Sequence, residues 1–306
     1  MPDDPHVYDL IIIGAGPAGI TSAVYAARQQ LDFFIITENI GGQTLWSSDV
    51  ENYTGFQYVS GAELVTIFEK HLKSYNINLR ENEIVEAIEK EGNIVKIRSS
   101  KGTYLAKTVI VASGKKSRKL GVPGENEYRN KGVFYCAICD GPIFKDKDVA
   151  IVGGGNSALD AAMQLVKIAK KIYIINNTNS VSGDNLLTEK ILNNEKVTVL
   201  NNSNVKSIEG DAFVKKIVIE HEKEKKEIKV EGVFIEVGLI PNSEFGVILK
   251  KNEKGEIVVD EYNRTNIPGI FAAGDVTTVP EKQIIIAAGE GSKALLGAFR
   301  YLSTTK

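Results

Sequence analysis

Residues 8–19 read YDLIIIGAGPAG, a short run of branched apolar residues that stops at a glycine motif. A helix-like stretch follows through Arg28, so the order is strand, glycine turn and helix. Gly14 permits the tight turn, Gly16 lets the backbone approach a pyrophosphate, and Gly19 allows close packing of helix on strand. The helix N-terminus attracts the phosphate charge. The pattern predicts a dinucleotide-binding α/β domain.

A second strand is predicted from Phe33 to Ile36, and it leads to Glu38. The spacing from the glycine motif suits a carboxylate that accepts hydrogen bonds from an adenosine ribose. The alternative is a glycine-rich turn in an ordinary parallel sheet with no ligand. The next motif, Gly41-Gly42-Gln43-Thr44, could let the chain pass close to a second part of the same ligand, although a plain loop would have the same sequence.

The pattern recurs in the middle of the chain. An apolar strand at 148–152 precedes Gly153-Gly154-Gly155-Asn156-Ser157-Ala158, and a helical stretch is expected from Leu159 to Ala169. This implies a second dinucleotide, with Ala158 in the third small position. The next strand, 172–175, ends at Asn176-Asn177-Thr178-Asn179. An adenosine 2'-phosphate would favour arginine here and a free 2'-hydroxyl would favour an acid, and neither is present.

The only two cysteines lie between these motifs, in Cys136-Ala137-Ile138-Cys139, with Asp140 directly after them. A Cys-x-x-Cys pair suits reversible two-electron exchange, and a neighbouring carboxyl group can deliver or accept the proton. Half of a zinc site and a pair of inert buried thiols are the alternatives. Zinc would need two further ligands from the scattered His6, His71 and His221, so no metal site is expected.

Towards the end of the chain, residues 269–275 form a short apolar strand that stops at a glycine and a carboxylate, and a closing helix is predicted from Lys282 to Phe299. Composition adds limits: 43% of the 306 residues are hydrophobic, so the chain can bury a sizeable core and is expected to form two domains. The charge-dense stretch from His221 to Glu227 mixes both signs, which predicts a solvated hairpin.

Charge and hydropathy narrow the partners and the location. Thirty-seven basic against 39 acidic side chains give a net charge of -2, so neither nucleic acid nor an anionic membrane is expected as a partner. No apolar run reaches bilayer length, and Met1 to Pro5 lacks the basic flank of a signal peptide. We therefore expect a cytoplasmic protein, in which a Cys-x-x-Cys pair is more often catalytic than structural.

Together these segments resemble the low-molecular-weight thioredoxin reductases and the similar flavoprotein subunit of alkyl hydroperoxide reductase. The resemblance covers nearly the whole chain. Besides the glycine and cysteine motifs, it rests on Val50-Glu51-Asn52-Tyr53, Gly238-Leu239-Ile240-Pro241-Asn242 and Phe271-Ala272-Ala273-Gly274-Asp275-Val276. It implies a homodimeric FAD enzyme of the α/β class, built from two Rossmann-like, three-layer domains. Residues 1–115 and 243–306 would bind FAD, and the inserted NAD(P)H-type domain, 116–242, would carry the cysteine pair.

The resemblance also implies roles for individual residues. Cys139 would be the thiol next to the flavin, Cys136 the thiol that attacks the partner disulfide, and Asp140 the acid-base group. The residues implied at FAD are Gly14, Gly16, Pro17, Ala18, Gly19, Glu38, Gly41, Gly42, Gln43, Asn52, Gly114, Gly274, Asp275, Gln283 and Ile284. Those implied at the nicotinamide dinucleotide are Gly153, Gly155, Asn156, Ser157 and Ala158.

In this family the inserted domain rotates, so segments 115–118 and 238–242 would swing the cysteine pair between flavin and protein substrate. Electrons would pass from NADH or NADPH to thioredoxin or a glutaredoxin-like protein. The hydroperoxide reductase relative carries an additional N-terminal redox domain. We expect none here, so a free-standing thioredoxin- or glutaredoxin-like protein would have to do that job.

The electron donor is the main departure from the family pattern. NADPH-using thioredoxin reductases carry a basic cluster where this chain has Asn176, Asn177 and Thr178. The hydroperoxide reductase branch uses NADH, and its usual acid is missing too. Three alternatives stay open: a reductase that takes electrons from ferredoxin, a ferredoxin or flavodoxin NADP reductase whose flavin alone carries electrons, and a nucleotide-bound redox sensor without turnover.

Overall fold

The computed structural model describes residues 6–46 and 50–304, so Met1 to Pro5, used above for the predicted location, lie outside it. The chain divides into two compact units. Unit 1 comprises Met1–Lys116 and Ile240–Lys306, and unit 2 comprises Ser117–Leu239. The domain limits predicted from the sequence differ from these divisions by one residue at the first crossing and by three at the second.

Unit 1 combines a large mixed sheet with three long helices. Its elements are β1 (Val7–Ala15), α1 (Pro17–Arg28), β2 (Phe33–Ile40), η1 (Gly42–Trp46), α2 (Gly61–Ser74), β3 (Leu79–Arg80), β4 (Val85–Glu91), β5 (Ile94–Ser99), β6 (Thr103–Val111), β17 (Ile270–Ala272), η3 (Gly274–Val276) and α6 (Ile284–Thr304). The strand order is β3-β2-β1-β6-β5-β4, and β17 pairs in parallel with β6.

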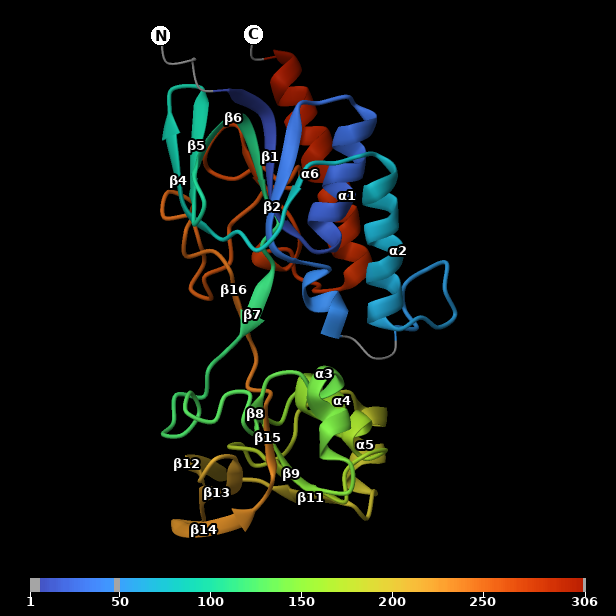
Figure 1. Cartoon of the computed structure of the whole chain (residues 1–306), viewed down its shortest axis with the longest axis vertical. Coiled ribbons are helices and arrows are strands. Elements are labelled where there is room, and N and C mark those ends of the chain that lie inside the picture. The colour runs from blue at the N-terminus through green and yellow to red at the C-terminus, as the bar shows by residue number, and fades with distance from the viewer. Residues whose placement is uncertain (1–5, 47–49, 305–306) are drawn as a thin grey trace. The chain divides into compact units, whose positions relative to one another are not determined.

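The central strands of unit 1 are buried on both faces, as is typical of parallel sheets. Leu10 and Ile12 of β1 pack with apolar residues of α1 and α6, whereas Ile11 and Ile13 point to the opposite face and pack against β4 and β5. Figure 1 shows α1, α2 and α6 together on one face of the sheet. The carboxyl ends of β1, β2 and β17 therefore meet at one edge of this unit.

Unit 2 repeats this plan on a smaller scale. Its elements are β8 (Val133–Phe134), α3 (Ala137–Asp140), η2 (Gly141–Phe144), β9 (Asp148–Val152), α4 (Asn156–Leu165), β10 (Lys171–Ile175), α5 (Asn185–Leu192), β11 (Val197–Leu200), β12 (Ser203–Gly210), β13 (Val214–His221), β14 (Glu224–Lys229) and β15 (Gly232–Ile235). The parallel sheet has the order β11-β10-β9-β15-β8, and β12, β13 and β14 form a separate antiparallel sheet.

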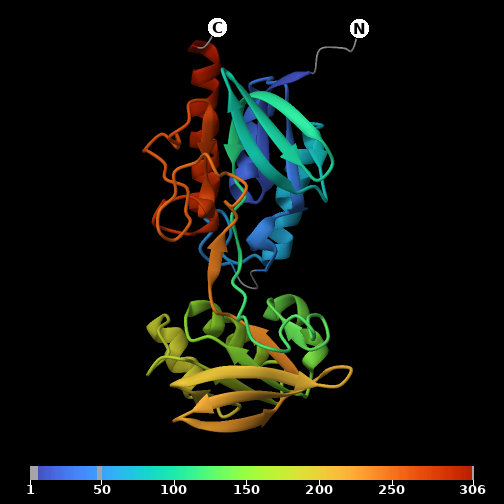
Figure 2. The same cartoon turned by 90° about the vertical axis from the view of Figure 1, so that its left-hand side faces the viewer.

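Each face of the parallel sheet in unit 2 has a cover of its own. Ile151 and Phe234 pack with the apolar residues of α4, whereas Val152 and Ile235 pack with apolar residues of β13. Figure 2 shows the antiparallel sheet along one side of this unit and the helices on the other. Unit 2 is therefore a three-layer structure with its own core.

The α/β class and the parallel sheets agree with the prediction, and several boundaries move. Helix α4 begins at Asn156 rather than Leu159, because Gly155 already serves as its N-cap. It ends at Leu165, where the chain tightens into i→i−3 hydrogen bonds, instead of continuing to Ala169. The predicted charged hairpin is confirmed as β13 and β14, joined by a turn in which Glu222 and Lys223 both have positive φ.

The chain crosses between the units twice, in β7 (Lys115–Ser117) and β16 (Leu239–Pro241), and these two strands pair with each other. Side chains of unit 1 secure the beginning of this ribbon. The Ser113 hydroxyl donates to the Asn242 carbonyl at 2.6 Å, and the Asn242 side-chain amide donates to the Ser113 carbonyl at 2.9 Å.

Candidate functional site

The first glycine turn requires glycine for steric reasons. Gly14 has φ +103°, and a β-carbon added to it would lie 2.4 Å from the Ala112 carbonyl oxygen. A β-carbon on Gly19 would lie 1.9 Å from the Gly14 carbonyl oxygen. Both separations are far below van der Waals contact, so the strand and α1 can approach this closely only without side chains at these positions.

The N-terminus of α1 is open where a phosphate would bind. Gly16 is its N-cap and provides no side-chain cap, and a β-carbon on Gly16 would have no heavy atom within 4 Å. Pro17 at the first helical position has no N–H group, and the first backbone bond of the helix runs from Ile20 N–H to the Gly16 carbonyl. The N–H groups of Ala18 and Gly19 therefore remain at the helix end, an arrangement that favours an anion.

Glu38 lies on β2 beside this turn, with its side chain exposed. Strand β2 extends two residues past Glu38, further than the predicted end. The preceding Thr37 is buried, and its hydroxyl accepts a hydrogen bond from Ala15 N–H at 3.2 Å and donates one to the Asn39 carbonyl at 2.6 Å. Thr37 thus holds the end of β2 against the glycine turn, a role with no signal in the motif spacing.

The second paired-glycine motif contacts the first. Gly42 has φ +53°, and a β-carbon on it would lie 3.4 Å from the Gly16 α-carbon. Gly41, with φ +90°, packs against Val65. Gln43 donates from its side-chain amide to the Lys115 carbonyl at 3.1 Å, directly after Gly114. The structure therefore brings the predicted Gly16, Gly42, Gln43 and Gly114 into one region of unit 1.

The remaining FAD candidates come from the C-terminal part of the chain. The Asn52 amide donates to the Gln283 side-chain oxygen at 3.1 Å, and Ile284 begins α6 immediately afterwards. Gly274 has φ +75°, and a β-carbon on it would lie 3.1 Å from the Ala18 β-carbon. Asp275 therefore follows a residue that contacts the open end of α1. Segments more than 200 residues apart in the sequence meet here.

A half-buried charge cluster beside Asp275 was not predicted. Glu256 accepts from the Lys115 ammonium at 3.1 Å and forms an ion pair with Lys282 at 3.4 Å. Burial raises the pKa of Asp275, and the charges of Lys282 and Lys115 oppose that rise. Burial lowers the pKa of Lys282. These residues are distant in the sequence and belong to no motif, so only the fold could reveal the cluster.

The second glycine turn has the same construction. Gly153 has φ +138°, and a β-carbon on it would lie 2.1 Å from the Glu236 carbonyl oxygen. Gly155 caps α4 without a side-chain hydrogen bond and has open space where a β-carbon would point. Ala158 is fully buried, and Ser157 is exposed at the first turn of α4. The Asn156 side-chain oxygen accepts from Asp184 N–H at 2.7 Å, so this residue orders the loop before α5.

Strand pairing shows which residues correspond in the two units. Ile13, directly before the first turn, pairs with Ile36, and Val152, directly before the second turn, pairs with Ile175. Thr37 therefore corresponds to Asn176, and Glu38 corresponds to Asn177. Thr37 and Asn176 are buried, whereas Glu38 and Asn177 are exposed.

Asn176 uses its side chain within the loop that follows β10. Its oxygen accepts from Thr178 N–H at 3.3 Å and from the Thr178 hydroxyl at 2.9 Å. Its amide donates to the Asn201 side-chain oxygen at 2.9 Å and to the Thr178 carbonyl at 3.3 Å. A β-carbon on Gly154 would lie 2.3 Å from the Asn176 oxygen. Asn176 is thus a structural residue, and Asn177 is the exposed residue at this position.

The cysteine motif follows β8 in unit 2. Cys136 is half-buried and directly precedes α3, and its carbonyl accepts a hydrogen bond from Asp140 N–H at 3.2 Å. The side chain of Cys139 lies outside the described part of the structure. Asp140 is half-buried, and burial raises the pKa of its carboxyl group. The buried Ala137 joins the same core cluster as α4, which anchors the motif to the nucleotide-type fold.

Tyr135, next to Cys136, is a further residue that the sequence did not single out. Its hydroxyl donates to Glu125 at 2.6 Å. The same buried carboxylate accepts from the N–H groups of Leu120 and Gly121 at 2.7 and 2.6 Å. Burial and the Glu125 charge raise the pKa of Tyr135 well above its ordinary value, so the hydroxyl stays a donor. The contact holds the residue before Cys136 in place.

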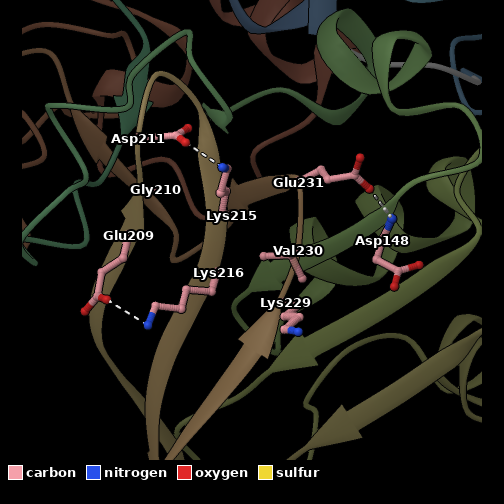
Figure 3. A pocket seen from close by; sticks show the side chains of 9 residues that line it. All are labelled: Asp148, Glu209, Gly210, Asp211, Lys215, Lys216, Lys229, Val230 and Glu231. Atoms are coloured by element: carbon pink, nitrogen blue, oxygen red, sulfur yellow. Dashed lines mark hydrogen bonds and ion pairs between the residues drawn. The ribbon is translucent and has the colours of Figure 1, made fainter.

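A cavity of about 610 Å³ lies elsewhere in unit 2, at the amino end of β9. Figure 3 shows that four of its charged side chains form ion pairs: Lys215 with Asp211, and Lys216 with Glu209. The glycine turns lie at the carboxyl ends of strands instead. This cavity therefore adds no group to the candidate site.

Within the described residues, 6–46 and 50–304, no helix combines the length and the apolar character needed to cross a membrane. No group of three or more His, Cys, Asp or Glu side chains in the same ranges could hold a metal ion.

Two curated relatives match nearly the whole chain. A protein named NADH dehydrogenase from Ferdinandcohnia aciditolerans is 40% identical over 303 residues, which cover 98% of this chain and 58% of the relative. A Pseudomonas putida protein, named as a subunit of alkyl hydroperoxide reductase, is 40% identical over 310 residues, which cover 98% of this chain and 59% of the relative. This chain thus spans less than two thirds of the length of these relatives.

Thioredoxin reductase from Lactococcus lactis has a similar solved structure, with a TM-score of 0.90 and 34% identity, covering 97% of this chain and 99% of that chain. The predicted resemblance and the two-domain Rossmann-like class are thereby confirmed. A family model described as pyridine nucleotide-disulphide oxidoreductase matches residues 8–291. The chain therefore belongs to the pyridine nucleotide-disulphide oxidoreductase family.

Proposed function

We propose that this chain is an FAD-dependent disulfide reductase that passes electrons from a nicotinamide dinucleotide to thioredoxin or a glutaredoxin-like protein. One observation carries the proposal. Each unit has an open glycine turn at a helix N-terminus, and the only two cysteines of the chain lie in the unit with the second turn. FAD and a nicotinamide dinucleotide are the cofactors of this family, as the sequence predicted.

The residues of unit 1 fit FAD. Open space at Gly16 and the uncapped first turn of α1 suit a pyrophosphate, and the exposed Glu38 suits the adenosine ribose. Gly42, Gln43, Asn52 and the Asp275 region would border the rest of the ligand. In unit 2 the open space at Gly155 and the uncapped α4 suit a second pyrophosphate in the same way.

When bound, FAD would supply the two-electron relay between the nicotinamide and the cysteine couple. The chain's own residues would complete the transfer. We assign Cys136 as the thiolate that attacks the partner disulfide, which gives a mixed disulfide and releases one partner thiolate. Cys139 would then attack Cys136, releasing the second partner thiolate and leaving a Cys136–Cys139 disulfide. Asp140, whose pKa is raised by burial, would supply a proton to a departing thiolate.

For the electron donor, we propose NADH or NADPH with little selection between them. The exposed residue after β10 is Asn177, which has neither the charge that would pair with a 2'-phosphate nor the carboxylate that would bind a 2'-hydroxyl. This same neutrality motivates the second candidate, a reductase fed by a ferredoxin-type donor. A flavin-only NADP reductase is disfavoured because it would leave the cysteine pair without a role.

We propose that unit 2 rotates about the paired strands β7 and β16, which carry both chain crossings. The rotation would bring the cysteine pair to the flavin and then to the protein substrate. We further propose a cytoplasmic homodimer, as the resemblance implies. A crosslink between the units should abolish partner reduction and spare flavin reduction; partner reduction that survives would contradict the rotating scheme.

Anaerobic flavin bleaching tests the function and separates the donors. Bleaching by NADH or NADPH, followed by reduction of a thioredoxin disulfide, is expected. Bleaching only by a reduced iron-sulfur protein would favour the second candidate. Cys136→Ser should remove thioredoxin reduction and leave bleaching by nicotinamide intact, whereas a flavin-only reductase would be unaffected. The absence of turnover with every donor and partner would favour a redox sensor.

A further inference from the structure

The position of Glu236 follows from the topology of unit 2. Strands β10 and β15 flank β9 in the parallel sheet, and β9 leads into the second glycine turn. Glu236 directly follows β15, and its N–H donates to the Val152 carbonyl at 2.8 Å. Its own carbonyl oxygen lies against Gly153. Glu236 is therefore part of the same carboxyl edge of the sheet as the glycine turn.

The same topology places the two halves of the expected dinucleotide beside different strands. In folds of this kind, the pyrophosphate binds at the glycine turn and the adenosine ribose contacts the residue after the next strand. That residue is Asn177, after β10. The nicotinamide half then extends to the other side of β9, where β15 ends in Glu236. This placement rests on the proposed function of unit 2 as a nicotinamide dinucleotide domain.

The neighbouring elements bring no positive charge to Glu236. The charged residue of α4 is Asp160, whose negative charge raises the pKa of Glu236. The charged residue of β9 is Asp148, at the opposite end of the strand. Strand β8 has no charged residue. Arg118 bonds to Gly238 through its backbone and has an exposed side chain.

The remaining charged neighbours are engaged elsewhere. Those of β13 form ion pairs within their own antiparallel sheet. The negative charge of Asp184, at the N-cap of α5, raises the pKa of Asp160. Within residues 6–46 and 50–304, no lysine or arginine forms an ion pair with Glu236. The pKa of Glu236 is raised to about 8. Burial is the larger cause of this rise, and the negative charge of Asp160 is the smaller one.

We propose that Glu236 determines how strongly unit 2 prefers the oxidised over the reduced nicotinamide dinucleotide. The oxidised ring carries a positive charge and the reduced ring carries none. A carboxylate with no cation of its own at this edge would stabilise the oxidised form selectively. Binding of the oxidised dinucleotide would favour ionisation of Glu236 and release a proton. By linkage, affinity for the oxidised form rises as the pH rises and Glu236 ionises.

Equilibrium binding to the FAD-loaded enzyme tests this without turnover. NAD+ is compared with 1,4,5,6-tetrahydro-NAD, whose ring is uncharged and cannot transfer a hydride. The forms without a 2'-phosphate are used because a phosphate group titrates near pH 6 and would add its own pH dependence. Between about pH 6.5 and 9, we expect the Kd of NAD+ to fall about fivefold relative to that of the tetrahydro analogue.

Three variants make the assignment specific. Glu236→Gln should remove this pH dependence and weaken the binding of NAD+ more than that of the analogue. Glu236→Asp should retain part of the pH dependence. Glu231→Gln, which changes a carboxylate beside the amino end of β15, should behave like the wild type. If Glu236→Gln keeps the wild-type pH dependence, the proposed role of Glu236 is wrong, and the proposed function of the chain still stands. If neither nucleotide binds any variant, both this inference and the nicotinamide donor fail, and bleaching by an iron-sulfur donor would still identify a disulfide reductase.

Discussion

The two glycine turns share a backbone design and differ in the residue that a ribose would meet. In both, a positive-φ glycine forms the turn after a buried strand, an uncapped glycine opens the helix, and a buried polar residue, Thr37 or Asn176, lies at the matching position of the next strand. One residue later, unit 1 exposes the carboxylate of Glu38 and unit 2 exposes the amide of Asn177. The fold is therefore repeated, and the two units differ in the residue at this one exposed position.

The largest expected effect comes from the third small position of the first turn. Gly19→Ala places a β-carbon 1.9 Å from the Gly14 carbonyl oxygen, so α1 must move away from β1. We expect FAD affinity to fall on the order of 100-fold, together with an overpacking cost of about 1–3 kcal/mol. Flavin absorbance per protein after gel filtration measures the loss.

The matched control is the equivalent position in unit 2, where Ala158 already carries a methyl group. Ala158→Gly should cost about 1 kcal/mol through helix propensity and change dinucleotide affinity only slightly. Equal losses of FAD in both variants would contradict the prediction, because the loss would then not depend on the close packing at Gly19.

A charge at position 177 should create a donor selectivity that, on the proposed function, the neutral Asn177 does not provide. Asn177→Arg is expected to raise the ratio of kcat/KM for NADPH to that for NADH by about 10- to 100-fold, because arginine binds a phosphate with paired hydrogen bonds. Asn177→Glu should move the ratio the opposite way, by repelling the 2'-phosphate and accepting from the free hydroxyls. Steady-state kinetics with both donors measure the ratio, and an unchanged ratio in both variants would place the ribose elsewhere.

Removing the charge at the corresponding position of unit 1 should have a smaller effect. Glu38→Gln keeps the shape but weakens the hydrogen bonds to the ribose hydroxyls, so we expect FAD affinity to fall about tenfold. Flavin release during dialysis, followed by titration with FAD, gives the affinity. Glu86→Gln, an exposed glutamate on β4, serves as the control and should leave FAD binding unchanged.

The smallest effects belong to the buried polar pair. Asn176→Ala removes the bonds to Thr178 and Asn201, and Thr37→Val removes the bonds to Ala15 and Asn39. Each should cost about 1–2 kcal/mol of local stability. Hydrogen exchange of backbone amides should quicken in unit 2 for the first variant and in unit 1 for the second. Faster exchange in both units from either change would show that their stabilities are coupled.

Local patterns were enough to predict the elements that hold the site. Branched apolar runs before the glycine motifs gave both parallel strands, and the mixed-charge stretch gave the β13–β14 hairpin. Those signals arise from backbone sterics and burial over a few residues. Helix α4 was misplaced at both ends because its start depends on the Gly155 cap and its end on a tightened turn, neither of which changes the apolar periodicity.

Features that depend on distant segments could not be read from the sequence. Glu256 reaches Lys115 across 141 residues, and Glu236 borders Gly153 only because β15 pairs with β9. The correspondence of Glu38 with Asn177, rather than with Asn176, required the strand registers. Sequence spacing is too coarse to separate two adjacent asparagines, whereas a one-residue shift in a strand reverses which side chain is buried.

The hydrogen bond between Arg118 N–H and the Gly238 carbonyl, 2.8 Å long, joins the first and last parts of unit 2. A segment whose two ends lie together can be exchanged for a homologous one with little disturbance to its host, since the junction geometry stays the same. Donor preference could thus be inherited or replaced as a cassette during evolution. A chimaera that receives residues 117–239 from a relative would acquire that relative's choice of reductant while it keeps its own flavin pocket.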